Sequence, residues 1–325
     1  MRPSGFRRQT IGFSLVLFLG VVIPLAVSAA ESDLAFKSAG NGLFDFNTGQ
    51  IKGMLRGTEK TQGIPSLIDV TSGREIAYNK DNLGLFSYYR LFSANKRWGD
   101  AARDWPRSAK LLSDGAVQLN WPPRSDHPVE LIASYRWKSP NTLDLETTVS
   151  PQQDMPRFEV FLSSYFSKGF RSLAYVKQPL HTPGPAYFLS CDVNPFILGT
   201  YLAFPRDRRA AEVLFDGRWD YGPNPVHFSV GRFLAQPLCL KRDAQSGITC
   251  VLMSRPGDCF AIETPYNMDP PDGIAGHYSL YLSLFGGDIK TSQSARALTR
   301  LVVGHDISEE AALDLYQKFI AEQSQ

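Results

Sequence analysis

The sequence is poor in the residues that build metal and covalent sites. Its 325 residues include only four cysteines and five histidines, with no Cys-x-x-Cys pair and no Cys/His spacing typical of zinc. It has no Gly-x-Ser-x-Gly elbow and no phosphate-binding glycine loop. We therefore expect no metal and no cofactor, and neither a serine hydrolase of the elbow type nor a P-loop enzyme.

Net charge is also nearly absent. The formal charge is +2 over the whole chain, and three arginines near the start account for this excess. A near-neutral chain does not hold nucleic acid or an acidic polymer by bulk charge, so we expect no nucleic-acid partner. The basic run from Arg206 to Arg209 is typical of a solvated loop.

The sequence has one long hydrophobic run, near its start, and no second run of comparable length. Arg2, Arg7 and Arg8 precede an apolar stretch from Ile11 to Val27, and small residues follow up to Ala30. This pattern predicts a signal peptide over residues 1–30 and a secreted or periplasmic protein with no membrane contact after cleavage. The alternative is an uncleaved N-terminal anchor. Residues 31–325 are then expected to form one domain.

Export would permit disulfides among the four cysteines, Cys191, Cys239, Cys250 and Cys259. Cys239 and Cys250 flank a turn-rich cluster and could face each other across a hairpin. Four cysteines allow three pairings, and the sequence does not choose among them.

Helix signals are scarce, whereas strand signals recur along the chain. Residues 129–137 alternate apolar and polar, as do residues 143–149, which predicts strands with one buried face. A proline-rich tract from Gln178 to Pro225 interrupts continuous pairing and predicts either loops around a site or plain connections. A C-terminal amphipathic helix, capped by Asp306 or Ser308, completes the pattern. The order predicts an all-β fold with a short C-terminal helix.

The run FAIETPYNMDPPDG, from Phe260 to Gly273, resembles a segment of the galactose mutarotases, or aldose 1-epimerases. The opening strands, GLFDFNTGQIKGMLRG and PSLIDVTSGREI, are similar to the first strands of that family. The resemblance implies a β-supersandwich and a sugar ligand, and it makes Glu263 the match to the family's catalytic base. Pro265 stands where the family has glutamine, and the family's histidine motif is absent.

Interconversion of sugar anomers needs a base at the anomeric hydroxyl and an acid at the ring oxygen. We expect Glu263 to be the base; the alternative is a solvated carboxylate at a strand end. His227 is the candidate acid, and His181 is a candidate substrate contact, while His277 follows the acidic loop. Each histidine is also compatible with a structural or surface role.

A second set of candidate sugar contacts is Asp216, Arg218 and Trp219 in the run DGRW, together with Arg90 after two tyrosines. Asp and Arg suit vicinal hydroxyls, and an indole suits the apolar side of a pyranose. The alternative is an ion pair that closes a turn beside a packed tryptophan. Arg90 is equally compatible with a solvent-facing position.

Together these features predict an exported protein that binds a mono- or polysaccharide and interconverts sugar anomers by acid–base catalysis. Two alternatives stay open. One is a non-catalytic carbohydrate-binding protein of the cell envelope, and the other is a polysaccharide lyase or glycoside hydrolase on the same scaffold. The sequence leaves the oligomeric state undetermined.

Overall fold

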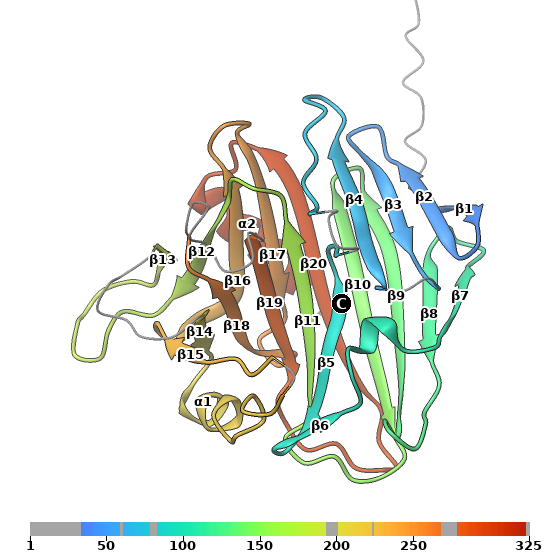
Figure 1. Ribbon diagram of the computed structural model, residues 1–325. Helices are drawn as coiled ribbons and strands as arrows, with labels where there is room; N and C mark the ends of the chain where they lie inside the picture. Colours follow the sequence, from blue (N-terminus) through green and yellow to red (C-terminus); the bar gives the residue numbers. More distant parts are fainter. Residues whose placement is uncertain are drawn as a thin grey trace, which may run out of the picture. The chain divides into compact units, whose positions relative to one another are not determined.

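The computed structural model describes residues 34–58, 61–78, 83–192, 201–222, 224–267 and 278–322 (Figure 1). The chain divides into two units, residues 1–31 and 32–325, and all described residues belong to the second. The predicted signal peptide, the loop from Asp269 to Gly273, and His277 lie outside the described residues. Within the described ranges, no helix is both long enough and apolar enough to span a membrane.

The largest sheet has nine strands, and all of its neighbouring pairs are antiparallel. Its order is β13 (Tyr187–Ser190), β12 (Phe170–Val176), β16 (Leu234–Asp243), β17 (Ile248–Ser254), β20 (Ala295–His305), β10 (Thr142–Pro151), β9 (Val129–Ser139), β8 (Val117–Trp121) and β7 (Ser108–Leu111).

A seven-stranded sheet carries the candidate site. Its order is β15 (Phe228–Val230), β14 (Tyr201–Pro205), β18 (Cys259–Pro265), β19 (Tyr278–Phe285), β11 (Glu159–Phe166), β5 (Ser87–Ser93) and β6 (Lys96–Trp98). Only the β14–β15 pair is parallel among these described strands.

The N-terminal part forms a four-stranded sheet of β1 (Lys37–Gly40), β2 (Leu43–Asn47), β3 (Ile51–Arg56) and β4 (Gly63–Asp69). A single antiparallel bridge between Ile64 and Leu85 connects β4 to the chain just before β5. The described helical elements are the 3-10 turn η2 (Ala102–Asp104), α1 (Arg208–Leu214) and α2 (Glu309–Glu322).

The main core contains the inward side chains of the three sheets. Strand β9 illustrates how alternation produces it. Val129, Leu131, Ala133, Tyr135 and Trp137 are buried, while the residues between them are partly exposed. The face predicted from the alternation is therefore the buried one, and the all-β architecture predicted from the sequence is confirmed.

Helix α2 covers the outer face of the nine-stranded sheet, as its apolar stripe predicts. Ala312, Tyr316 and Phe319 pack against side chains of β16, β17 and β20. Ser308 is the capping residue, because its Oγ accepts a hydrogen bond from the backbone N–H of Ala311.

The four cysteines are buried free thiols. Strands β16 and β17 do form the expected hairpin, but Cys239 lies opposite Leu252 and Cys250 lies opposite Lys241. The two thiols are therefore offset by two residues along the hairpin. Burial raises the pKa of Cys239 to about 12, so this thiol is protonated at neutral pH.

Candidate functional site

The outer face of the seven-stranded sheet is partly covered by the chain itself. Strands β18 and β19 are buried almost end to end, because their inward residues enter the main core and their outward residues also lie under protein. The cover is the chain from Arg206 to His227, Pro223 excepted, which we call the covering segment. Helix α1 within it packs on β14 and β18 (Figure 1). Asp207 starts this helix by accepting a hydrogen bond from the N–H of Ala210.

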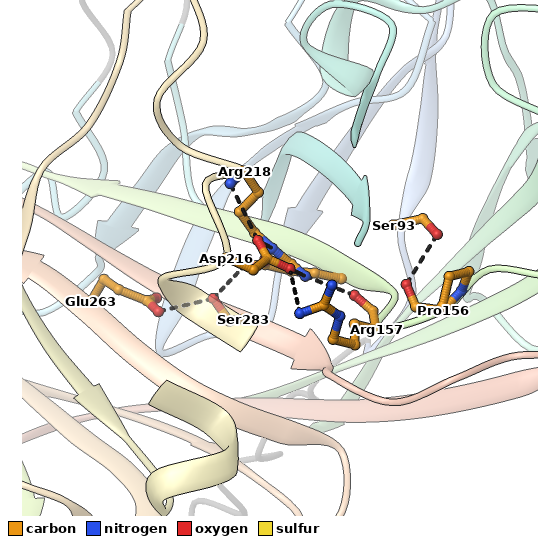
Figure 2. Close-up of polar contacts among 8 residues, drawn as sticks. Ser93, Pro156, Arg157, Asp216, Arg218, Glu263 and Ser283 are labelled. Atoms are coloured by element: carbon orange, nitrogen blue, oxygen red, sulfur yellow. Dashed lines mark hydrogen bonds and ion pairs between the residues drawn. The ribbon is translucent and has the colours of Figure 1, made fainter. Parts of the chain in front are cut away.

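Arg218 joins the covering segment to the sheet. Its side chain is fully buried, and its Nη1 donates to Oε2 of Glu159 on β11 at 2.6 Å. Its Nε and Nη2 donate to the two oxygens of Asp216, each at 2.9 Å, and Nη2 also donates to the carbonyl oxygen of Arg157. Figure 2 shows this fork of bonds around the guanidinium. One buried cation is thus held by two carboxyl groups, which is the geometry a buried charge requires.

Ser283 on β19 extends this network to Glu263 on β18. Its hydroxyl lies 2.7 Å from Oε1 of Glu159 and 2.9 Å from Oε1 of Glu263 (Figure 2). A hydroxyl has one proton, so Ser283 can donate a hydrogen bond to only one of the two carboxyl groups. Its contact with the other is a hydrogen bond only if that carboxyl group is protonated and donates to the serine oxygen. We refer to Glu159, Asp216, Arg218, Glu263 and Ser283 as the carboxyl network.

The two carboxyl groups that contact Ser283 differ in their surroundings. Burial, and then the charge of Glu159, raise the pKa of Glu263 well above its ordinary value. Glu159 has the Arg218 cation beside it, whereas Glu263 has no cation within ion-pair distance among the described residues. These surroundings favour the protonated form at Glu263, and in that form Glu263 donates to Ser283 while Ser283 donates to Glu159. The other oxygen of Glu263, Oε2, is buried and has no hydrogen-bond partner in the described part of the chain.

Trp219 and Arg90 pack within the protein. Trp219 is 3% exposed, and its ring centroid lies 4.6–5.2 Å from those of Phe92, Phe161 and Phe228. The Arg90 guanidinium lies 4.9 Å from the centre of the same indole. The indole face expected for a sugar is therefore taken up by these side chains. The structure corresponds to the alternative stated for the run DGRW, in which an ion pair closes a turn beside a packed tryptophan.

Arg90 is not solvent-facing. It is 2% exposed, and its Nη2 donates to the carbonyl oxygen of Asn224 at 2.7 Å and to the Tyr89 hydroxyl at 3.2 Å. Because Asn224 belongs to the covering segment, Arg90 attaches that segment to β5.

The two candidate histidines lie away from the carboxyl network. His227 is exposed and, with Trp219, lines a hollow of about 170 Å³ in the covering segment, below the 300–1,000 Å³ usual for ligand pockets. Glu263 is not among the residues lining that hollow. His181 is exposed in the connection between β12 and β13, with a φ of 68°. No described histidine hydrogen-bonds to Glu263.

A second group of side chains lies on the same sheet face and packs beside Leu214 and Trp219 of the covering segment. Tyr89, Tyr165, Tyr201 and Tyr281 come from β5, β11, β14 and β19, and we call them the tyrosine cluster. The ring centroids of Tyr165 and Tyr201 lie 6.1 Å and 6.0 Å from that of Tyr281. Tyr89 and Tyr201 are partly exposed, whereas Tyr165 and Tyr281 are buried beneath them.

Arg103, just before β7, borders the tyrosine cluster. Its Nη1 donates to the Tyr165 hydroxyl at 3.2 Å, and its guanidinium lies 4.8 Å from the centre of the Tyr89 ring. Aromatic rings, hydroxyl groups and a guanidinium thus meet at one partly exposed place. Among the described residues, no group of three or more histidine, cysteine or acidic side chains is arranged to hold a metal ion.

The structure therefore brings together Asp216, Arg218 and Glu263, with Arg90 and Trp219 beside them, and leaves His227 and His181 apart. Sequence reasoning missed Glu159 and Ser283, which lie inside apolar strands, and it missed the tyrosine cluster and Arg103. One usable signal was present, since each of the four strands that supply the cluster carries a tyrosine within an apolar run.

Comparison with known proteins assigns no family to this chain. Profiles of known protein families give no match, and a search of curated protein sequences gives none either. Solved structures that are similar include a protein assigned as an aldose 1-epimerase from Escherichia coli K12, at a TM-score of 0.47 and 12% identity. That match covers 81% of this chain and 100% of the other.

Two further solved structures match at similarly low TM-score and sequence identity. The Slr1438 protein of Synechocystis sp. PCC 6803 has a TM-score of 0.46 and 13% identity, over 79% of this chain and 92% of that one. A mutant of the heparan sulfate lyase HepC from Pedobacter heparinus has a TM-score of 0.45 and 7% identity, over 84% of this chain and 37% of the lyase. The sheets described above show the all-β architecture expected from the sequence.

Proposed function

We propose that this protein binds a carbohydrate on the tyrosine cluster. The observation that carries the proposal is the meeting of four tyrosines from four strands on one sheet face, with two of them partly exposed. Tyrosine offers an apolar face to the C–H side of a sugar ring and a hydroxyl to its polar edge. This arrangement supports recognition of a pyranose ring.

The geometry favours binding over turnover. A base must reach the proton that it removes, within about 2.6–3.2 Å of its acceptor atom. Glu263 is fully buried beneath the covering segment, and its neutral form does not accept a proton. A non-catalytic carbohydrate-binding protein therefore suits the described residues better than an epimerase.

We also propose that the protein works outside the cytoplasm. The support is the charged, apolar and small-residue order of residues 1–30, which is typical of a signal peptide. In this proposal residues 31–325 are the mature, single-domain protein, which is secreted or periplasmic.

The test uses the mature chain on a glycan array, followed by calorimetric titration of the glycans it retains. Wild type should bind at least one saccharide saturably, and Tyr89→Ala should weaken that binding about tenfold, since one ring-stacking contact is lost. Tyr221→Ala is the matched control, because Tyr221 is 54% exposed and lies outside the cluster. Binding that survives Tyr89→Ala, or fails equally in the control, would contradict the proposal.

One observation favours anomer interconversion as a second candidate. Glu263 combines a raised pKa with a buried oxygen that lacks a partner in the described structure, and such groups concentrate at active sites. The test is an anomerisation assay on a sugar panel with wild type and Glu263→Gln. Equal trace rates on every sugar would remove the epimerase candidate, and release of unsaturated or reducing ends from a polymer would indicate a lyase or hydrolase instead.

A further inference from the structure

Arg103 is held in place by aromatic side chains. Its guanidinium lies 4.8 Å from the centre of the Tyr89 ring and 5.8 Å from that of Tyr165. Its Nη1 donates to the Tyr165 hydroxyl, which is a neutral acceptor. Stacking of this kind positions the planar fork of an arginine and leaves its charge uncompensated.

Within the described ranges, no carboxylate lies within ion-pair distance of Arg103. The adjacent Asp104 is directed elsewhere, because its Oδ1 accepts from the backbone N–H of Thr61 at 2.8 Å. The Nε of Arg103 is buried and has no hydrogen-bond partner in the described part of the chain.

A second cation contacts the Tyr89 ring. The Arg90 guanidinium is 4.7 Å from the centre of the same Tyr89 ring. Two guanidinium groups therefore contact one partly exposed tyrosine. Glu159 and Glu263, which lie on β11 and β18 of the same sheet, belong to the carboxyl network. The tyrosine cluster is thus positively charged at its Arg103 edge.

From this geometry we propose that the saccharide bound on the tyrosine cluster is anionic, and that Arg103 binds its carboxylate or sulfate group. The guanidinium fork matches two oxygens of either group, and Tyr89 and Tyr165 hold the fork in position. This inference rests on the proposed carbohydrate binding and specifies the class of ligand.

The experiment compares matched acidic and neutral probes by calorimetric titration of the mature protein. One pair is trigalacturonate and its methyl ester, and the other is a dextran oligomer with and without sulfate esters. At least one acidic probe should bind about 10- to 100-fold more tightly than its neutral partner, as expected for a hydrogen-bonded charge. The pair that shows the preference tells a carboxylate ligand from a sulfate ligand.

Two variants locate the effect. Arg103→Gln should remove the preference for the acidic probe and leave the affinity for the neutral probe unchanged, while Arg103→Lys should restore part of the preference. Arg136→Gln is the control, because Arg136 pairs with Asp114 at the surface of the nine-stranded sheet. In wild type, added salt should weaken binding of the acidic probe and leave binding of the neutral probe unchanged. This measurement tests the charge contribution without any substitution.

The outcomes separate this inference from the proposed function. If neutral probes bind as tightly as acidic ones, or if Arg103→Gln weakens both equally, the anionic ligand is excluded and carbohydrate binding stands. If no saccharide binds at all, the proposed function fails and the inference falls with it.

Discussion

The two halves of one sheet face differ in what satisfies their polar groups. In the carboxyl network the buried cation of Arg218 is matched by Glu159 and Asp216, and the Ser283 hydroxyl links Glu159 to Glu263. In the tyrosine cluster the cation of Arg103 meets aromatic rings and a hydroxyl instead. In the first half the cation is paired with carboxylates, whereas in the second half no carboxylate of the described residues pairs with the cation of Arg103.

This difference indicates how the face is used. A buried ion pair is destabilising to break and has nothing further to bind, so it attaches the covering segment to the sheet. A partly exposed aromatic and cationic edge retains hydrogen-bond donors for an incoming group. The residues that look most catalytic in the sequence therefore lie in the structural half.

The largest expected effect is on stability in the carboxyl network. Arg218→Met should lower the free energy of unfolding by about 3–5 kcal/mol, because it leaves Glu159 buried without its cation. Arg157→Met is the control, since the Arg157 side chain is 45% exposed and its pair with Asp216 should contribute less than about 1 kcal/mol. Urea unfolding measures both changes. Equal, small losses in the two variants would show that the network does not hold the segment.

The second effect is a pH dependence of stability that comes from Glu263. In the folded state this carboxyl group keeps a proton that the unfolded chain loses above its ordinary pKa of 4.5, because burial raises the folded pKa. Its stabilising contribution is fully present below pH 4.5 and is lost as the pH rises through the folded pKa, by at most about 1.4 kcal/mol per pH unit.

The matched variant for this pH dependence is Glu263→Gln, which keeps the shape of the neutral carboxyl group and cannot ionise. Subtracting its unfolding free energy from that of wild type, across the pH range, isolates the titration of Glu263. The difference should fall as the pH rises above 4.5. A difference that does not change with pH would mean that the pKa of Glu263 is the same in the folded and unfolded protein, which contradicts a buried, protonated Glu263.

The smallest expected effect lies in the tyrosine cluster. Tyr165→Phe removes the hydroxyl that accepts from Arg103 and keeps the ring. We expect the affinity for an acidic saccharide to fall about three- to tenfold, in line with one hydrogen bond of about 1 kcal/mol. Titration calorimetry measures it, with the neutral partner saccharide as control. A loss of several kcal/mol in unfolding free energy would place Tyr165 with the structural half instead.

Much of the fold could be predicted from the sequence, because strand alternation and helix capping are local signals. The buried face of β9 and the Ser308 cap of α2 follow directly from neighbouring residues. The sequence analysis did not predict helix α1, because its seven residues lie inside the proline-rich tract from Gln178 to Pro225. Short helices held by packing have little local signal.

The candidate site could be predicted only in part, because burial and partners are set by distant segments. The run DGRW suggested an Asp–Arg pair, which forms, but the third partner, Glu159, comes from a strand 59 residues away. The pairing of Glu263 with Ser283 likewise depends on strand register. The tyrosine cluster forms only where four strands come together in the sheet, so no single segment of the sequence predicts it.

The most direct measurement is the affinity of one saccharide, selected on the array, for wild type, Tyr89→Ala and Trp219→Phe. Trp219 is packed among aromatic rings in the structural half, and Tyr89 lies at the exposed edge of the other half. The account predicts that Tyr89→Ala weakens binding about tenfold and that Trp219→Phe leaves it unchanged. Unchanged binding in Tyr89→Ala, together with loss in Trp219→Phe, would contradict it.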